Sequence, residues 1–70
     1  MAETIKVHIP EHLRAGIYSN IANIQVSKNE VILDFIFAKP EEATLVSRVV
    51  LSLEHAKSLE KVLSNVLKDK

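Results

Sequence analysis

The 70-residue chain has no cysteine and no tryptophan, and it contains a single glycine and two prolines. The absence of cysteine excludes disulfides, thiolate zinc sites and nucleophilic cysteine chemistry, and it fits a reducing compartment. A single glycine also leaves no Gly-rich loop that could hold a phosphate. The hydrophobic content of 47% indicates a folded chain and not a disordered tail, so we expect one domain over residues 1–70.

Neither sign of charge is in excess, because nine basic residues balance nine acidic ones. A neutral chain lacks the summed field that draws proteins to nucleic acids or anionic membranes, so neither partner is favoured. No apolar run approaches the roughly 18 residues of a membrane span. Met1–Thr4 hold an acid and none of the basic residues that begin a signal peptide. We therefore expect a cytoplasmic protein.

The chain is also too short to bury a large core. At 7.8 kDa, a compact fold would leave roughly 4,400 Å² exposed out of roughly 11,300 Å² in the unfolded chain. Domains of this size usually add disulfides, a metal or partner subunits. Without cysteine, association between subunits is the route that remains, so a homo-oligomer is expected.

Alternation of apolar and polar residues predicts strands, with polar turns at Ser27–Glu30 and Lys39–Glu42 joining the last three into an antiparallel meander. The pattern in the first stretch is weaker, because it is short and ends at a proline. It therefore predicts three or four strands. The expected strands are residues 5–9, 17–26, 31–38 and 43–51.

A single C-terminal helix is predicted over residues 53–68. Ser52 is a suitable N-cap, Glu54 lies in the first turn where the helix dipole favours an acid, and apolar residues recur every three or four positions. The predicted fold is α+β, with this helix packed on one face of the sheet.

The hairpins set the register and hence the two faces. The first turn places Val26 opposite Val31, and the second places Ala38 opposite Thr44. One face, called the first face below, is almost wholly apolar and is the expected seat of the helix. It collects Asn20, Ala22, Ile24, Val26, Val31, Leu33, Phe35, Phe37, Leu45, Ser47, Val49 and Leu51.

The opposite face, called the second face, is more apolar than a solvated sheet face should be. We interpret it as a subunit interface, most simply in an isologous dimer. The alternative is that residues 5–9 and 10–16 fold back over it within the same chain. The predicted interface residues are Ile17, Ile21, Ile32, Ile36, Val46 and Val50.

A polar row crosses the second face, where Asn23, Asp34 and Arg48 are predicted to lie side by side on adjacent strands. Asp34 could be read as a catalytic acid or base. A buried ion pair that fixes strand register is the favoured interpretation, because an unpaired charge on such a face would be costly. Replacing Asp34 with alanine should then destabilise or dissociate the protein by leaving Arg48 without its partner.

Other chemistry has little support in the sequence. His8, His12 and His55 lack the spacing of a zinc helix, and solvated or locally bonded histidines are favoured. No serine has a base at a motif spacing, so no enzyme, cofactor or metal is predicted. Tyr18, Ser19 and Asn20 form a polar and aromatic cluster that could serve in recognition, or could simply anchor the hairpin.

Several motifs together resemble a small prokaryotic family known only as domain of unknown function three-four-six-seven. The likeness covers residues 14–67 and implies a stand-alone β-sheet and helix protein without an assigned activity. The family usually has proline after the serine that begins the helix, where this chain has Leu53. The motifs are Gly16-x-Tyr18-Ser19-Asn20, Ser27-x-x-Glu30-x-x-Leu33-Asp34-Phe35, Pro40, Arg48-Val49 and Ser52-x-x-His55-Ala56-Lys57-x-Leu59.

The sequence therefore predicts a non-enzymatic, oligomeric scaffold or adaptor that binds another protein. The alternative is a dimeric, nucleic-acid-associated regulator in which dimerisation gathers Arg14, Lys28, Lys39 and Lys57 on one surface.

Overall fold

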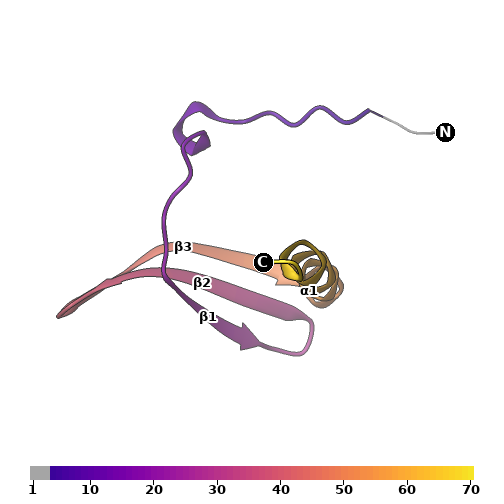
Figure 1. Cartoon of the computed structure of the whole chain (residues 1–70). Helices are drawn as coiled ribbons and strands as arrows, with labels where there is room; N and C mark the ends of the chain where they lie inside the picture. Colours follow the sequence, from indigo (N-terminus) through magenta and orange to yellow (C-terminus); the bar gives the residue numbers. More distant parts are fainter. Residues whose placement is uncertain (1–3) are drawn as a thin grey trace.

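The computed structural model describes residues 4–70, and its elements form one three-stranded antiparallel sheet followed by one helix (Figure 1). The predicted α+β meander with a C-terminal helix is thereby confirmed. Residues 1–3, which carry most of the expectation about a signal peptide, lie outside the described residues. The elements are a short 3-10 helix η1 (Glu11–Leu13), the strands β1 (Ile21–Val26), β2 (Glu30–Lys39) and β3 (Glu42–Ser52), and the helix α1 (Leu53–Leu67).

The sheet has three strands because residues 5–9 pair with no strand of the described chain. They run along an extended segment that stands away from the sheet (Figure 1). Strand β1 also begins at Ile21 instead of Ile17. On the observed register of this hairpin, Ile17 would face Pro40, which lies in the next turn and has no N–H to donate. The ladder also stops before Ser19, because the Asn20 side chain already bonds the N–H and the carbonyl of Ala38, which Ser19 would face.

The predicted register of the first hairpin is confirmed from Val26↔Val31 to Ile21↔Ile36. That of the second hairpin is confirmed from Val31↔Leu51 to Phe35↔Ser47 and then shifts by one residue. Ala38 consequently faces Ala43, and the predicted partner Thr44 is wrong.

The shift arises in the turn between β2 and β3. Lys39 pairs with Glu42, so the turn has only two residues, Pro40 and Glu41, and Glu41 adopts a φ of 68°. A tight turn of this kind moves the register by one position relative to the longer loop that the sequence indicated. A bulge at Val46 absorbs the difference. Leu45 is thereby moved from the first face to the second.

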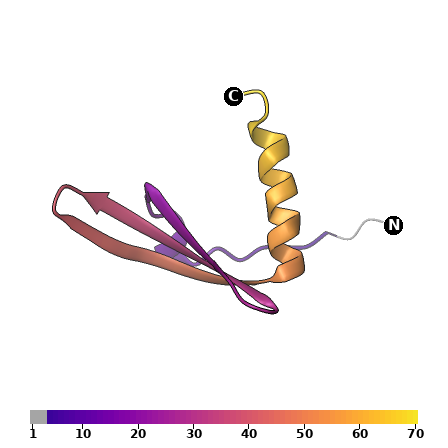
Figure 2. The same ribbon diagram turned by 90° about the horizontal axis from the view of Figure 1, so that it is seen from below.

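Helix α1 starts where β3 ends, with no residue between them. Ser52 is the last residue of β3 and also the N-cap, and its Oγ accepts a hydrogen bond of 3.1 Å from the His55 N–H. The Leu53 N–H donates to the Asn29 carbonyl at 3.1 Å. Figure 2 shows the helix rising away from the sheet instead of lying on it. The expected packing of the helix on a sheet face is therefore not made within one chain.

The resulting chain has very little core. Val31 and Leu51, which face each other near the start of α1, are its only buried apolar residues within the described part of the chain. The accessible area is 6645 Å², against roughly 4,400 Å² for a compact chain of this mass. The radius of gyration is 15.1 Å, against about 11 Å for a compact chain of this length. A single copy thus leaves about 2,200 Å² of surface that a compact domain would bury.

Candidate interaction surfaces

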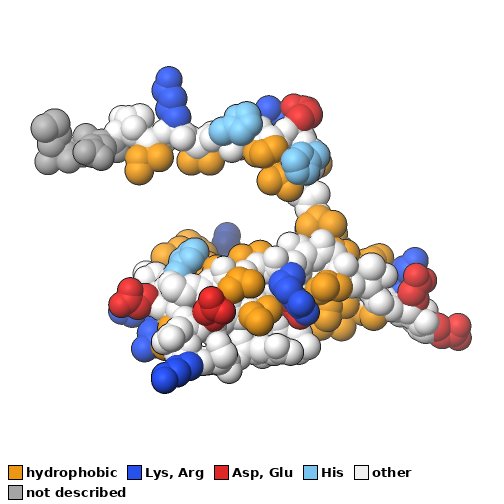
Figure 3. Space-filling view, turned by 180° about the vertical axis from the view of Figure 1, so that it is seen from behind, with side chains coloured by type: hydrophobic (Ala, Val, Ile, Leu, Met, Phe, Trp, Pro, Cys, Tyr) orange, Lys and Arg blue, Asp and Glu red, His pale blue; other side chains and the backbone are white. Residues whose placement is uncertain are grey.

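The first face of the sheet is an open apolar surface. It carries Leu33, Phe35 and Phe37 from β2, flanked by Ile24 and Val49 from the neighbouring strands. Ile24 is 60% exposed, and the two phenylalanines are half-buried. Figure 3 shows hydrophobic side chains on the sheet and, separately, along the N-terminal segment that stands away from it. Within residues 4–70, this face is covered at its ends, where Val31 and Leu51 are buried beside the start of α1 and Tyr18 contacts Phe37. Its middle stays open, although it has no charged residue.

The second face is also open, and it contains four of the six predicted interface residues. Strand pairing places Ile21 beside Ile36, and Ile32 beside Val50, on this face. Val50 is 55% exposed. Ile17 lies outside the sheet, and Val46 is the residue of the bulge.

Leu45, which pairs with Ile36, takes the place on the second face that Val46 was expected to fill. Sequence reasoning missed Leu45 because the bulge reverses the alternation of side chains beyond it. The second face therefore stays apolar, with Leu45 in the position that was predicted for Val46.

The polar row lies where the register predicted it. Asn23 pairs with Asp34, and Asp34 pairs with Arg48 on the other side. The Arg48 guanidinium donates a hydrogen bond to each oxygen of the Asp34 carboxylate, from Nε to Oδ1 at 2.6 Å and from Nη2 to Oδ2 at 2.9 Å. Such bidentate pairs are short and geometrically specific. No side-chain hydrogen bond from Asn23 reaches the pair among the residues that the structure describes.

The environment of the pair is asymmetric. The Asp34 side chain is 9% exposed, while that of Arg48 is 56% exposed and extends over it toward solvent. The hydrogen bond from Arg48 lowers the pKa of Asp34, against the opposing effect of burial, and the Arg48 charge adds to the lowering. A carboxylate held in its ionised form by a neighbouring arginine is poorly suited to accept or deliver a proton at neutral pH. This geometry supports the structural interpretation of the row over a catalytic one.

The cluster Tyr18, Ser19 and Asn20 lies at the start of β1. The Asn20 side chain acts as an additional rung of the ladder, because its amide donates to the Ala38 carbonyl at 3.0 Å and accepts from the Ala38 N–H at 2.9 Å. The Tyr18 ring packs edge-on against Phe37, with centroids 5.8 Å apart and an angle of 76° between the rings. Asn20 is therefore occupied structurally, which leaves Tyr18 and Ser19 as the candidates for recognition.

Tyr18 and Ser19 also border a shallow hollow on the first face, together with Ile17, Phe35 and Ser47. Tyr18 remains 71% exposed although it contacts Phe37. A ring that is held on one edge and open on the other is suited to contact with a further apolar surface.

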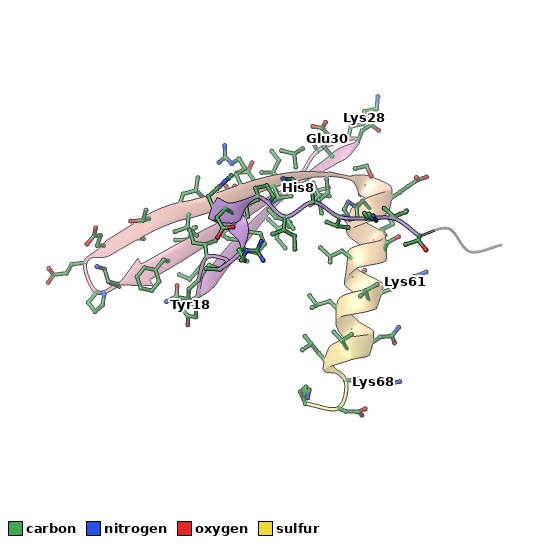
Figure 4. The ribbon with its side chains drawn as sticks, turned by 90° about the horizontal axis from the view of Figure 1, so that it is seen from above. His8, Tyr18, Lys28, Glu30, Lys61 and Lys68 are labelled. Carbon is green, nitrogen blue, oxygen red and sulfur yellow. The ribbon has the colours of Figure 1, made fainter. Side chains whose placement is uncertain are left out.

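The helix presents a third apolar surface, which sequence reasoning assigned to the core of the same chain. The stripe comprises Leu59, Val62, Leu63, Val66 and Leu67, and each of these side chains is between 39% and 59% exposed. Figure 4 shows Lys61 and Lys68 projecting together from one side of the helix. The sequence already indicated this exposure. The predicted strand and helix left only Ser52 between them, which is too short a connection for the helix to fold back on the sheet.

No cluster that could hold a metal was found in the part of the chain that the structure describes. His8 lies on the extended segment, His12 in η1 and His55 in the first turn of α1, and no group of three His, Cys, Asp or Glu residues within residues 4–70 is placed to bind an ion. Over the same residues, no helix is both long and apolar enough to cross a membrane.

Comparison with known proteins identifies one family. The family described as "Protein of unknown function (DUF3467)" matches residues 1–69, which is nearly the whole chain. No curated protein and no solved structure matches the chain significantly. The suspected family resemblance is thereby confirmed.

Proposed function

This chain belongs to the DUF3467 family, and we propose that it acts as a small cytoplasmic homo-oligomer, without enzymatic activity, that serves as a scaffold or adaptor for another protein. The observation that carries the proposal is the large apolar surface of the single chain. Both sheet faces and the helix stripe are largely open, and Val31 and Leu51 are the buried apolar residues among residues 4–70. Such surfaces on a water-soluble chain indicate contacts with other protein surfaces.

The total accessible area of the chain, which includes the extended segment before β1 as well as the sheet and the helix, also supports self-association. The excess over a compact chain is about 2,200 Å² for each copy, or about 4,400 Å² for two. Obligate homodimers bury roughly 2,000 to 5,000 Å² in total, so two copies could bury the excess within the ordinary range. Transient contacts between separately stable proteins are smaller. The chain is therefore best explained as part of a permanent assembly.

The second face is the proposed self-contact. Ile21, Ile32, Ile36 and Val50 form its apolar part, and Leu45 extends it. The bidentate pair of Asp34 and Arg48 interrupts the apolar area at one place. A fixed polar group in an apolar contact favours one alignment of the two surfaces over its alternatives.

Binding of another protein is proposed at the edge of the sheet. Strand β1 is an edge strand, because the sheet order is β1-β2-β3 and no other described strand pairs with β1. An extended peptide can add to such an edge through main-chain hydrogen bonds. Tyr18 and Ser19 lie just before this strand and could add side-chain contacts.

The charges do not favour nucleic acid as the partner. Of the four cations that would have to gather on one surface, Arg14 lies 3.4 Å from Glu11, and Lys39 lies 3.8 Å from Glu42. These acids offset the positive potential that phosphate contacts require. Nucleic-acid binding therefore enters only as an outcome of the test.

The test is to measure the mass of the purified chain by light scattering and then to ask what co-purifies with it. We expect at least a dimer at micromolar concentration, and a protein that is retained by the native chain and lost when Tyr18 and Ser19 are both changed to alanine. A monomer with intact helix and strand signals would refute the self-association. Retention on DNA or RNA that falls steeply with salt would replace the adaptor by the nucleic-acid regulator.

A further inference from the structure

The junction between β3 and α1 prevents the helix from covering its own sheet. A helix that folds back on the strand before it needs a connecting loop, usually of two to six residues. Here Ser52 belongs to the strand and caps the helix, so the connection has no free residue. The bond from Leu53 to Asn29 also ties the first helical turn to the loop between β1 and β2. Figure 2 shows the resulting direction of the helix, which rises at a steep angle from the end of the sheet instead of lying along it.

The helix nevertheless requires an apolar partner. It has 15 residues, and an isolated helix of that length is marginal in water without tertiary packing. Its apolar residues from Leu59 to Leu67 cover about 140° of the helix circumference at 100° per residue, which is the width of a stripe that packs on another surface. Lys57, Lys61 and Lys68 lie on the opposite side. A helix of this composition is stable only where another surface covers its apolar side.

We propose that helix α1 packs on the first sheet face of a second copy of the chain, and that the second copy returns the contact. This inference rests on the proposed self-association and specifies how it is built. Reciprocal exchange gives a closed twofold dimer in which each copy covers what the other exposes. The occupant is a second copy because the helix stripe and the middle of the first face are both open in one chain, where the helix rises from the end of the sheet instead of lying along it.

The two surfaces match in chemistry and in length. The first face has Leu33, Phe35 and Phe37 along its middle strand and no charge in its centre, whereas the second face contains Asp34 and Arg48. An uncharged helix stripe therefore fits the first face better than the second. The 15-residue helix is about 22 Å long. The ten residues of β2 extend about 33 Å, so the helix lies within the length of the strand.

The exchange and the proposed second-face contact use opposite faces of the sheet, so they do not compete. A chain that made only one of them would form a dimer, and a chain that made both would form an assembly of at least four copies. The mass measured for the proposed function therefore also reports how many of the faces are used.

Cross-linking tests the exchange directly, because the chain has no native cysteine. One copy carries Leu63→Cys and a size tag, and an untagged copy carries Phe35→Cys. The two are unfolded together, refolded and treated with a short bismaleimide. We expect a covalent product of one tagged and one untagged copy. Lys61→Cys replaces Leu63→Cys in the first control, and Ile36→Cys on the second face replaces Phe35→Cys in the other.

Three outcomes would overturn the exchange. In the first, a double variant with Phe35→Cys and Leu63→Cys in the same chain gives a product cross-linked within a single copy instead of between two copies. The helix could cross-link to Ile36→Cys in preference to Phe35→Cys. The protein could also remain an oligomer by light scattering without any helix-to-sheet product, and in that case self-association stands while the exchange fails. A monomer would contradict both proposals.

A milder variant keeps the test independent of cross-linking. Leu63 is 50% exposed in the single chain, so association into a dimer would bury the exposed half of this side chain in each of the two copies. Leu63→Ala is expected to raise the dissociation constant of the dimer about 30-fold. Lys61→Ala is the matched control and should leave it unchanged. Equal effects of the two substitutions would contradict the exchange.

Discussion

Dilution is expected to lower the melting temperature of this protein, because its folding unit is proposed to contain two copies. One copy buries only about 40% of the surface of its unfolded chain, whereas compact domains of this size bury about 60%. If the second copy supplies the rest, unfolding separates two chains and its equilibrium depends on their concentration. A chain that folded alone would melt at the same temperature at every concentration.

The size of the effect follows from the length of the chain. Two 70-residue copies should unfold with an entropy of about 0.3 kcal/mol/K, at about 2.1 cal/mol/K for each residue. Each tenfold dilution changes the free energy of dissociation by about 1.4 kcal/mol. The melting temperature should therefore fall by about 5 °C for each tenfold dilution.

The assay is circular dichroism during heating, in cells of different path length so that the total signal stays constant. A tandem fusion of two copies through a flexible Gly/Ser linker is the control, because its association is intramolecular and its melting temperature should not change. A reversible transition of the native chain at one temperature across about a hundredfold dilution would refute the reasoning.

Three further predictions concern single side chains, each measured by urea unfolding at one fixed protein concentration. Asn20→Ala removes two hydrogen bonds to Ala38, near the end of β2, and should lower the free energy of unfolding by about 1 to 2 kcal/mol. An unchanged urea midpoint would contradict the role of Asn20 as a rung of the ladder. Ser52→Ala removes the helix cap and should lower the free energy of unfolding by about 1 kcal/mol, whereas Ser52→Asp can still cap the helix and should keep most of that stability. Because the hydrogen bond from Arg48 lowers the pKa of Asp34 in the folded protein, the stability from this pair is complete above the ordinary carboxyl pKa of about 4 and is lost as the pH falls through the lowered value. Asp34→Asn should therefore lose less stability than the native chain between neutral and acidic pH, and parallel profiles would contradict the pair.

The first hairpin was predictable because its residues constrain the register strongly. Ser27–Glu30 supplies polar turn chemistry, and the apolar alternation on both sides permits only one alignment that gathers the apolar residues of both strands on the first face. The same constraint correctly placed Asn23 opposite Asp34. Asp34 is also opposite Arg48 as predicted, because the bulge at Val46 offsets the error in the second turn. The candidate polar site could thus be predicted from sequence in its position and in its pairing.

The second turn was not predictable from the same kind of pattern. A two-residue turn at Pro40 and Glu41 requires positive φ at glutamate, which non-glycine residues adopt only rarely. Sequence patterns therefore favour a longer loop there. The bulge at Val46 then corrects the register before Ser47, so the error stays confined to the end of the hairpin and to the faces of Leu45 and Val46.

The seat of the helix shows what periodicity can and cannot specify. Apolar residues at spacings of three and four indicate that one side of α1 needs an apolar cover, but they do not specify which molecule provides it. The connection decides that question, because only a loop would allow the helix to turn back on its own strand. Ser52 acts as strand end and helix cap at once, so the local signals that predict the two elements correctly also remove the loop. The first face and the helix stripe of one chain are complementary surfaces that this junction keeps apart, which is the physical reason to look for their contact between two copies.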